Sequence, residues 1–199
     1  MKKRFPLLTA ISLLLLLTGC EKILIVHLFD ASASAINNAE FIKEEQQVCH
    51  GIVDALKSSD RYARIPVNSQ MAAQDPDKIT SREKLHRECK NQPQPKGEGT
   101  FSCPAWQLAI ELSDRYPEYR PLIVTQIQSD ELETFCTSTL QTLSRKISDR
   151  QGQLIFIGSS NEGSKFNSNL WEELKTLPNT KFCQKNGRAC VTEAINSLR

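Results

Sequence analysis

The sequence lacks the short motifs that mark the commonest kinds of catalytic site. It contains no Gly-x-Ser-x-Gly elbow, no phosphate-binding glycine-rich loop and no dinucleotide-binding fingerprint. Histidine, a frequent general base, occurs only three times in the chain. None of the three lies in the polar loops from which a nucleophile such as Asp30 would act. These absences argue against an enzyme.

The chain also lacks a strong excess of charge of either sign. It has 25 lysines and arginines against 23 acidic residues, and three of the basic residues, Lys2, Lys3 and Arg4, belong to the first few positions. The remainder is close to neutral, so its charge gives no reason to expect binding to nucleic acid. No apolar run reaches the roughly 20 residues that a membrane-spanning helix needs.

The N-terminal segment has the features of a secretion signal. The basic residues precede an apolar stretch from Phe5 to Leu17, and Leu17-Thr18-Gly19-Cys20 resembles the lipobox of bacterial lipoproteins. In that family the peptide is cut just before the cysteine, which then carries the lipid. An uncleaved anchor is the alternative, and the short apolar stretch disfavours it.

This segment divides the chain into three parts. We expect a signal peptide over residues 1–19, lipidated (palmitoylated) Cys20 with a tether over residues 20–22, and one domain over residues 23–199. Glu21 is not the aspartate that retains enterobacterial lipoproteins at the inner membrane. The sequence therefore favours the outer membrane, at its periplasmic face or its surface.

Six cysteines remain after Cys20. An even number in an exported chain favours disulfides over free thiols, although the sequence cannot choose their pairing. A turn-like segment between the last two favours a local bridge there. The six are Cys49, Cys89, Cys103, Cys136, Cys183 and Cys190.

A zinc site is the alternative use of the first two cysteines. Cys49-His50 and His86-x-x-Cys89 offer two sulfur and two nitrogen ligands. Their spacing matches no common zinc pattern, and an oxidising compartment disfavours free thiolates. We therefore expect disulfides at these cysteines.

Apolar runs alternate with amphipathic stretches along the domain. The run Ile23–Phe29 is almost continuously apolar, as expected of a parallel strand covered on both faces, and its His27 is expected to be a neutral, hydrogen-bonded core residue. The alternation predicts an α/β fold, a doubly wound, mostly parallel sheet of about five to six strands with helices on both faces. The predicted strands are Ile23–Phe29, Tyr62–Val67 (near the sheet edge because of Pro66), Leu122–Ile127, Leu154–Ile157 and Thr180–Cys183. The predicted helices are Ala35–Lys57, Thr80–Cys89, Trp106–Leu112, Leu132–Ile147, Leu170–Leu177 and Val191–Leu198.

Oxygen-bearing side chains follow two predicted strands and one glycine-rich loop. They are Asp30, Ser32 and Ser34 after the first strand, Thr100 after Gly97-Glu98-Gly99, and Asp130 after Leu122–Ile127. Ligands of doubly wound sheets bind outside the carboxyl ends of the strands, so we expect these loops to converge. An all-oxygen set suits a hard cation such as Mg²⁺. Serine and aspartate at a helix start are also ordinary N-caps, which leaves a purely structural role open.

The order of these elements resembles the von Willebrand factor type A domain over about residues 23–198, judged along the sheet. That family carries a metal-ion-dependent adhesion site (MIDAS), and the five oxygen-bearing residues match its three loops. The resemblance implies Mg²⁺ (or Mn²⁺ or Ca²⁺) bound directly by the two serines. It implies that the two aspartates hold water on the ion and that the threonine binds it directly or through water. Glu131, where the family commonly has glycine, lies with Glu98 and Phe101 at the expected rim of the partner site.

The sequence thus predicts a lipid-anchored envelope protein that is not an enzyme. It would bind a partner protein that offers an Asp or Glu carboxylate to the metal, and the membrane through Cys20. The alternative is a structural envelope lipoprotein with a degenerate metal site. That protein would bind through another face, such as Phe101, Phe166 or the loop Ser159–Ser164.

Overall fold

A six-stranded sheet with the strand order β3-β2-β1-β4-β5-β6 forms the centre of the protein. The computed structural model describes residues 21–67, 77–78, 81–91, 102–126, 136–158, 175–183 and 186–199. Five strands are parallel: β1 (Ile23–Asp30), β2 (Arg61–Val67), β4 (Arg120–Gln126), β5 (Gln153–Ile157) and β6 (Thr180–Cys183). The two-residue β3 (Asp77–Lys78) runs antiparallel to β2 at the edge. This confirms the predicted doubly wound, mostly parallel α/β sheet.

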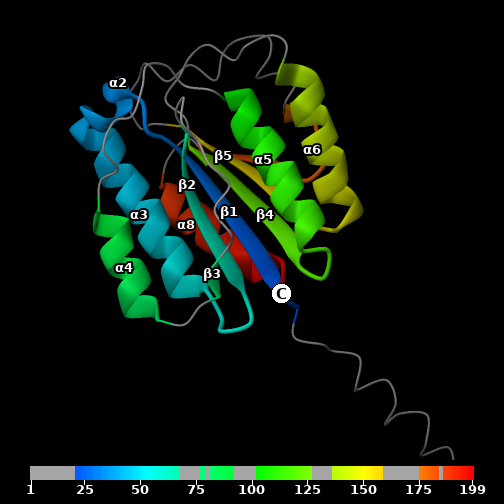
Figure 1. The fold of residues 1–199 in the computed structure, drawn as a ribbon, viewed down its shortest axis with the longest axis horizontal. Helices are drawn as coiled ribbons and strands as arrows, with labels where there is room; N and C mark the ends of the chain where they lie inside the picture. Colours follow the sequence, from blue (N-terminus) through cyan, green and yellow to red (C-terminus); the bar gives the residue numbers. More distant parts are fainter. Residues whose placement is uncertain are drawn as a thin grey trace, which may run out of the picture.

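Helices cover both faces of the sheet (Figure 1). One layer contains α3 (Ala39–Ala55), α4 (Arg82–Lys90) and α8 (Gly187–Ser197), and the other contains α5 (Ser102–Arg115) and α6 (Thr137–Asp149). The central strand β1 is buried along its whole length, and its alternate side chains enter the two layers. Burial on both faces explains why its sequence is almost continuously apolar. No helix in the described part of the chain is long and apolar enough to cross a bilayer.

The predicted helix Ala35–Lys57 is wrong as a single element. The structure has a short α2 (Ala33–Ile36) and then α3. Asn38 separates them with an extended backbone, and its side-chain oxygen accepts hydrogen bonds from the amides of Glu40 (3.1 Å) and Phe41 (3.2 Å). An asparagine cap of this kind ends one helix and starts the next.

The other described elements agree with prediction to within a few residues at most boundaries. Pro104 lies in the first turn of α5, and β2 lies next to the sheet edge, as Pro66 indicated. Residues 127–135, and with them the start of the predicted helix Leu132–Ile147, lie outside the described residues. The same holds for residues 170–174 of the helix predicted at Leu170–Leu177.

Three disulfides use all six cysteines of the domain. The bridges are Cys49–Cys89, Cys103–Cys136 and Cys183–Cys190. The expected disulfides and the local bridge between the last two cysteines are confirmed. The zinc alternative loses both of its sulfur ligands, because a disulfide sulfur is not the thiolate that zinc requires.

The parallel strands share two ends, which we call the amino edge and the carboxyl edge of the sheet, and the two ends of β1 lie at these opposite edges. At its amino end, the buried Asp60 accepts hydrogen bonds from the amides of Ile23 (3.1 Å) and Lys57 (2.7 Å), and it pairs with Arg199 (2.5 Å). At its carboxyl end Asp30 leads into α2, which lies far from the C-terminus in Figure 1. The edge that carries Asp30 therefore faces away from the start of the domain.

Candidate functional site

The loop after β1 brings a carboxylate and two hydroxyls together. Asp30, the last residue of β1, is only 1% exposed, and its Oδ1 accepts a hydrogen bond from the amide of Ser32 at 2.9 Å. The hydroxyl oxygens of Ser32 and Ser34 lie 3.1 Å apart. Neighbouring ligands of an octahedral Mg²⁺ lie about 3 Å apart, because its bonds to oxygen are about 2.0–2.1 Å long. The hydroxyl pair therefore fits two adjacent positions on such an ion.

The N-cap role that the sequence left open is also present. Ser32 has an extended backbone before α2, and its hydroxyl oxygen accepts a hydrogen bond from the amide of Ala35 at 3.4 Å. This cap explains Ser32 without an ion. It does not explain Ser34, which is exposed inside α2 and whose hydroxyl shares a hydrogen bond with that of Ser32. The cap and the ligand role are compatible, since a hydroxyl oxygen has two lone pairs.

The loop also lies where the winding of the sheet reverses. From β1 the chain continues through α3, in one layer, to β2, while from β4 it continues to α6 in the other layer. Phe29 of β1 is in register with Gln126 of β4, so the carboxyl ends of these strands are neighbours. A crevice between such strands is the usual ligand site of a doubly wound sheet.

The remaining predicted site residues lie outside the described residues. They are Thr100 and Asp130 of the metal set, Glu98, Phe101 and Glu131 of the rim, and the lipidation site Cys20. Asp130 comes four residues after Gln126, and a chain of that length reaches at most about 14 Å. A chain of this length could bring Asp130 next to Asp30. Their convergence stays a prediction.

A disulfide joins the segments that follow the second and third predicted loops. Cys103, in the first turn of α5, comes three residues after Thr100, and Cys136, just before α6, comes six residues after Asp130. The bridge links the starts of α5 and α6 on one face of the sheet. No pattern in the sequence indicated this connection between the segments after the two loops.

A second polar cluster is buried around His27, in the middle of β1. His27 is fully buried; its Nδ1 lies 3.3 Å from the hydroxyl of Tyr62 and its Nε2 lies 3.4 Å from Oε1 of Gln126. Because the Gln126 oxygen only accepts, Nε2–H donates to it and Nδ1 accepts from Tyr62. Burial, and then the charge of Arg64, lower the pKa of His27 to about 3. The predicted neutral, hydrogen-bonded core histidine is confirmed.

This cluster includes three potential metal ligands. One atom each of His27, Glu45 and Cys49 lies within 4.8 Å of the other two. The Cys49 sulfur, however, is in a disulfide, and the two carboxylate oxygens of Glu45 accept hydrogen bonds from Arg64 at 2.9 and 2.8 Å. Because these atoms are already bonded, we interpret the three residues as part of a structural network and not as a metal centre.

Sequence reasoning missed the buried pair of Glu45 and Arg64, although a signal was available. Glu45 lies on the apolar face of α3 between Ile42 and Val48, which are three residues away on either side. A carboxylate on the apolar face of a helix must pair with a cation or be protonated, because an unpaired buried charge is very costly. Here Arg64 of β2 supplies the cation, while burial still raises the pKa of Glu45.

Acid is expected to destabilise the protein through His27. The folded protein holds the pKa of this residue at about 3, against 6.5 ordinarily. As the pH falls below about 6.5 only the unfolded chain binds the proton, so the unfolding free energy falls by about 1.4 kcal/mol per pH unit. Urea unfolding at pH 7 and pH 5 should therefore differ by about 2 kcal/mol from this residue.

His27→Gln is the comparison that isolates this effect. The raised pKa of Glu45 acts in the opposite direction, because the folded state then takes up a proton in acid, but it acts in both proteins. Neutral glutamine keeps hydrogen-bonding groups in the core and should flatten the slope between pH 7 and pH 5. Equal slopes in the two proteins would show that His27 takes up a proton in the folded state.

Comparisons with known proteins agree with the fold. No protein-family model matches the chain, and a search of curated proteins finds no match. An aerotolerance-related membrane protein from Bacteroides fragilis is similar, with a TM-score of 0.64 and 14% identity over 88% of this chain and 97% of that chain. Von Willebrand factor type A from Catenulispora acidiphila has a TM-score of 0.65 and 11% identity over 89% of this chain and 42% of that chain.

A third similar structure contains a metal. It is proximal thread matrix protein 1 from the mussel byssus with a zinc-occupied MIDAS motif, with a TM-score of 0.59 and 13% identity over 89% of this chain and 45% of that chain. At such identities the likeness establishes the fold. The chain has the doubly wound α/β fold of von Willebrand factor type A domains, as its sequence predicted.

Proposed function

We propose that this protein is a non-catalytic binding module, anchored to the bacterial envelope by a lipid on Cys20, which captures a partner protein through a divalent metal ion. The ion is Mg²⁺, or Mn²⁺ or Ca²⁺ in its place. Its ligand set consists of Asp30, Ser32, Ser34, Thr100 and Asp130. The observation that carries the proposal is the 3.1 Å separation of the Ser32 and Ser34 hydroxyls beside the buried Asp30.

The ligand chemistry suits capture of a carboxylate. The hydroxyls of Ser32 and Ser34 are neutral ligands, while Asp30 and Asp130 act through water molecules. With few anionic groups in direct contact the ion keeps its affinity for a further negative oxygen. An Asp or Glu side chain of the partner would supply it, with Glu98, Phe101 and Glu131 at the rim of the contact.

The position of the site suits a tethered receptor. Asp30 and α2 lie at the carboxyl edge of the sheet, and the domain begins at the opposite edge (Figure 1). A lipid attached just before the domain would direct the metal edge away from the bilayer. The zinc-occupied MIDAS motif of the mussel protein supports metal binding at this position of the fold.

Mg²⁺ titration into the protein, followed by calorimetry, is expected to give a saturable heat. Ser34→Ala should weaken Mg²⁺ binding about tenfold or more, because it removes one direct ligand. The fold should be unaffected, because Ser34 is exposed. Ser197→Ala, at the opposite edge of the sheet, is the matched control and should bind as the parent does. Capture of the partner from detergent-solubilised envelopes should be lost in EDTA and restored by Mg²⁺.

The alternative lipoprotein predicts the opposite pattern. Its degenerate site would give no heat with Mg²⁺ or Mn²⁺, and its capture of a partner would persist in EDTA. Ser32 would then serve only as the N-cap of α2. That combined result would overturn the metal-dependent proposal.

A further inference from the structure

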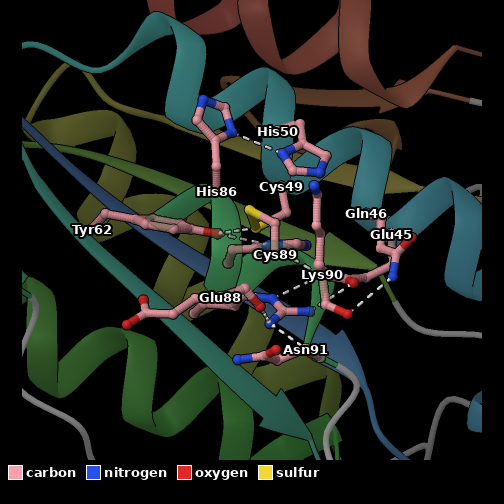
Figure 2. Close-up of a disulfide and its surroundings, with 12 residues drawn as sticks. Glu45, Gln46, Cys49, His50, Tyr62, His86, Glu88, Cys89, Lys90 and Asn91 are labelled. Atoms are coloured by element: carbon pink, nitrogen blue, oxygen red, sulfur yellow. Dashed lines mark hydrogen bonds and ion pairs between the residues drawn. A yellow bond between two sulfur atoms is a disulfide. The ribbon is translucent and has the colours of Figure 1, made fainter. Parts of the chain in front are cut away.

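Two histidines from neighbouring helices meet beside the Cys49–Cys89 disulfide. Nδ1 of His50, on α3, lies 2.8 Å from Nδ1 of His86, on α4 (Figure 2). Both side chains are partly exposed at the outer flank of the sheet. The contact is separate from the loop after β1, which lies at the carboxyl edge.

A carboxylate favours one tautomer of the His86 ring. Oδ1 of Asp54, one helical turn after His50 on α3, lies 3.2 Å from Nε2 of His86. The carboxylate favours a proton on Nε2, and in that tautomer the lone pair of Nδ1 is directed at His50. Metal-binding histidines usually donate their second nitrogen to a carboxylate in this way. With His86 oriented as an acceptor, the Nδ1–H of His50 donates to it.

The disulfide holds the two rings at this separation. Cys49 directly precedes His50, Cys89 comes three residues after His86, and both cysteines are fully buried. A side-chain amide hydrogen bond from Gln46 to the carbonyl of Lys90, at 3.4 Å, adds a second link between the helices. The disulfide thus holds the two helices, and with them the two nitrogens, close together.

From this geometry we infer that His50 and His86 form a binding site for a transition-metal ion such as Zn²⁺, Cu²⁺ or Ni²⁺, with Asp54 as the residue that positions His86. Bonds of about 2.0–2.1 Å place two coordinating nitrogens about 2.9 Å apart in square-planar or octahedral geometry and about 3.3 Å apart in tetrahedral geometry. The observed 2.8 Å needs a shift of only a few tenths of an ångström and a rotation of the rings. Imidazole nitrogens favour these ions over Mg²⁺ and Ca²⁺.

Binding changes the tautomer of His50 and leaves its ring neutral. Nδ1 loses its proton and Nε2 takes one up, so both Nδ1 atoms bind the metal with no net release of protons, and water fills the open positions. Burial lowers the pKa of His50, which favours its neutral form. Arg188 and Lys90 contribute positive charge nearby, and Asp54, which pairs with Arg188 at 2.7 Å, offsets part of it.

The test is titration of the lipid-free protein with ZnCl₂ by calorimetry, and with CuSO₄ followed by electron paramagnetic resonance. With excess Mg²⁺ present to occupy the other proposed site, we expect saturable binding of one Zn²⁺, and a Cu²⁺ spectrum with coupling to two imidazole nitrogens. His86→Ala and His86→Gln should each weaken Zn²⁺ binding more than about 100-fold, since each removes a direct ligand. Asp54→Asn should weaken it by about 10–100-fold with both nitrogens still bound.

Controls separate this site from the proposed Mg²⁺ site. Ser34→Ala should leave Zn²⁺ binding at the histidines unchanged, and His86→Gln should leave Mg²⁺ binding unchanged. Thermal melting of each variant checks the fold, which the disulfide maintains when the partly exposed ring is lost. Zn²⁺ affinity that is unaltered in both His86 variants, or a Cu²⁺ spectrum with one nitrogen, would overturn the inference.

Discussion

Arg64→Ala is expected to lower the free energy of unfolding by about 3–5 kcal/mol at pH 8. Arg64 contacts both oxygens of Glu45, at 2.9 and 2.8 Å, and the Glu45 side chain is only 2% exposed. Removing the guanidinium leaves a carboxylate without its cation in the core, which costs far more than losing an exposed pair. Arg64 also donates to the carbonyl of Glu88 at 2.7 Å, so α4 loses a contact as well.

The pH dependence of this loss identifies its cause. Without Arg64 the already raised pKa of Glu45 should rise further, so the folded variant takes up a proton as the pH falls. The destabilisation should therefore be smaller at pH 5 than at pH 8, as measured by urea unfolding of parent and variant at both values. Adding Glu45→Gln to Arg64→Ala should recover part of the stability at pH 8.

Arg87→Ala is the matched control. It breaks a pair with Glu83 at a similar distance, 3.0 Å, but with side chains 68% and 83% exposed. Such exposed pairs contribute about 0–1 kcal/mol. A loss of this small size for Arg64→Ala too would mean that water reaches Glu45 in solution.

The second large effect is expected from Cys103→Ser combined with Cys136→Ser. A sequence separation of 33 residues gives a loss of about 3–4 kcal/mol from the chain entropy of the unfolded state. If the proposed function holds, Mg²⁺ affinity should fall as well, because this bridge links the segments that follow Thr100 and Asp130. Urea unfolding and Mg²⁺ calorimetry on the same variant measure the two effects.

Cys183→Ser combined with Cys190→Ser provides the comparison. Its sequence separation is only 7 residues, so the entropic loss should be smaller, about 2–3 kcal/mol. Its bridge joins α8 to β6, which β4 and β5 separate from β1 in the sheet, and Mg²⁺ affinity should be unchanged. If both pairs leave Mg²⁺ affinity intact, the Cys103–Cys136 bridge stabilises the fold without organising a metal site.

The local hydrophobic pattern predicted most of the helices and strands. The prediction failed where a polar residue interrupts a helical pattern. The apolar run at β1 identified a strand covered on both faces, since such a strand has no solvent-facing side. The break between α2 and α3 was missed because Ile36 and Ala39 still fit a helical spacing. The signal was Asn38, a residue type that often caps helices.

The candidate sites divide in the same way. Asp30, Ser32 and Ser34 were predicted as a candidate set because they lie within five residues of one another and follow a recognisable strand. The pair Glu45–Arg64 was not, because its members are 19 residues apart and meet only when α3 packs against β2. The sequence grouped His50 with His86 only as part of a disfavoured zinc site, and the packing of α3 against α4 shows that the two rings meet.

Residue order alone predicts the alternation of strands and helices, the even set of cysteines and the oxygen-rich loop after β1. These features depend on side-chain periodicity and residue type over short stretches, which the chain carries before it folds. The tertiary structure was needed to show how the four cysteines other than Cys183 and Cys190 pair, which cation neutralises Glu45 and that the rings of His50 and His86 meet. Those choices depend on the packing of helices on a sheet, which brings distant segments within bonding distance.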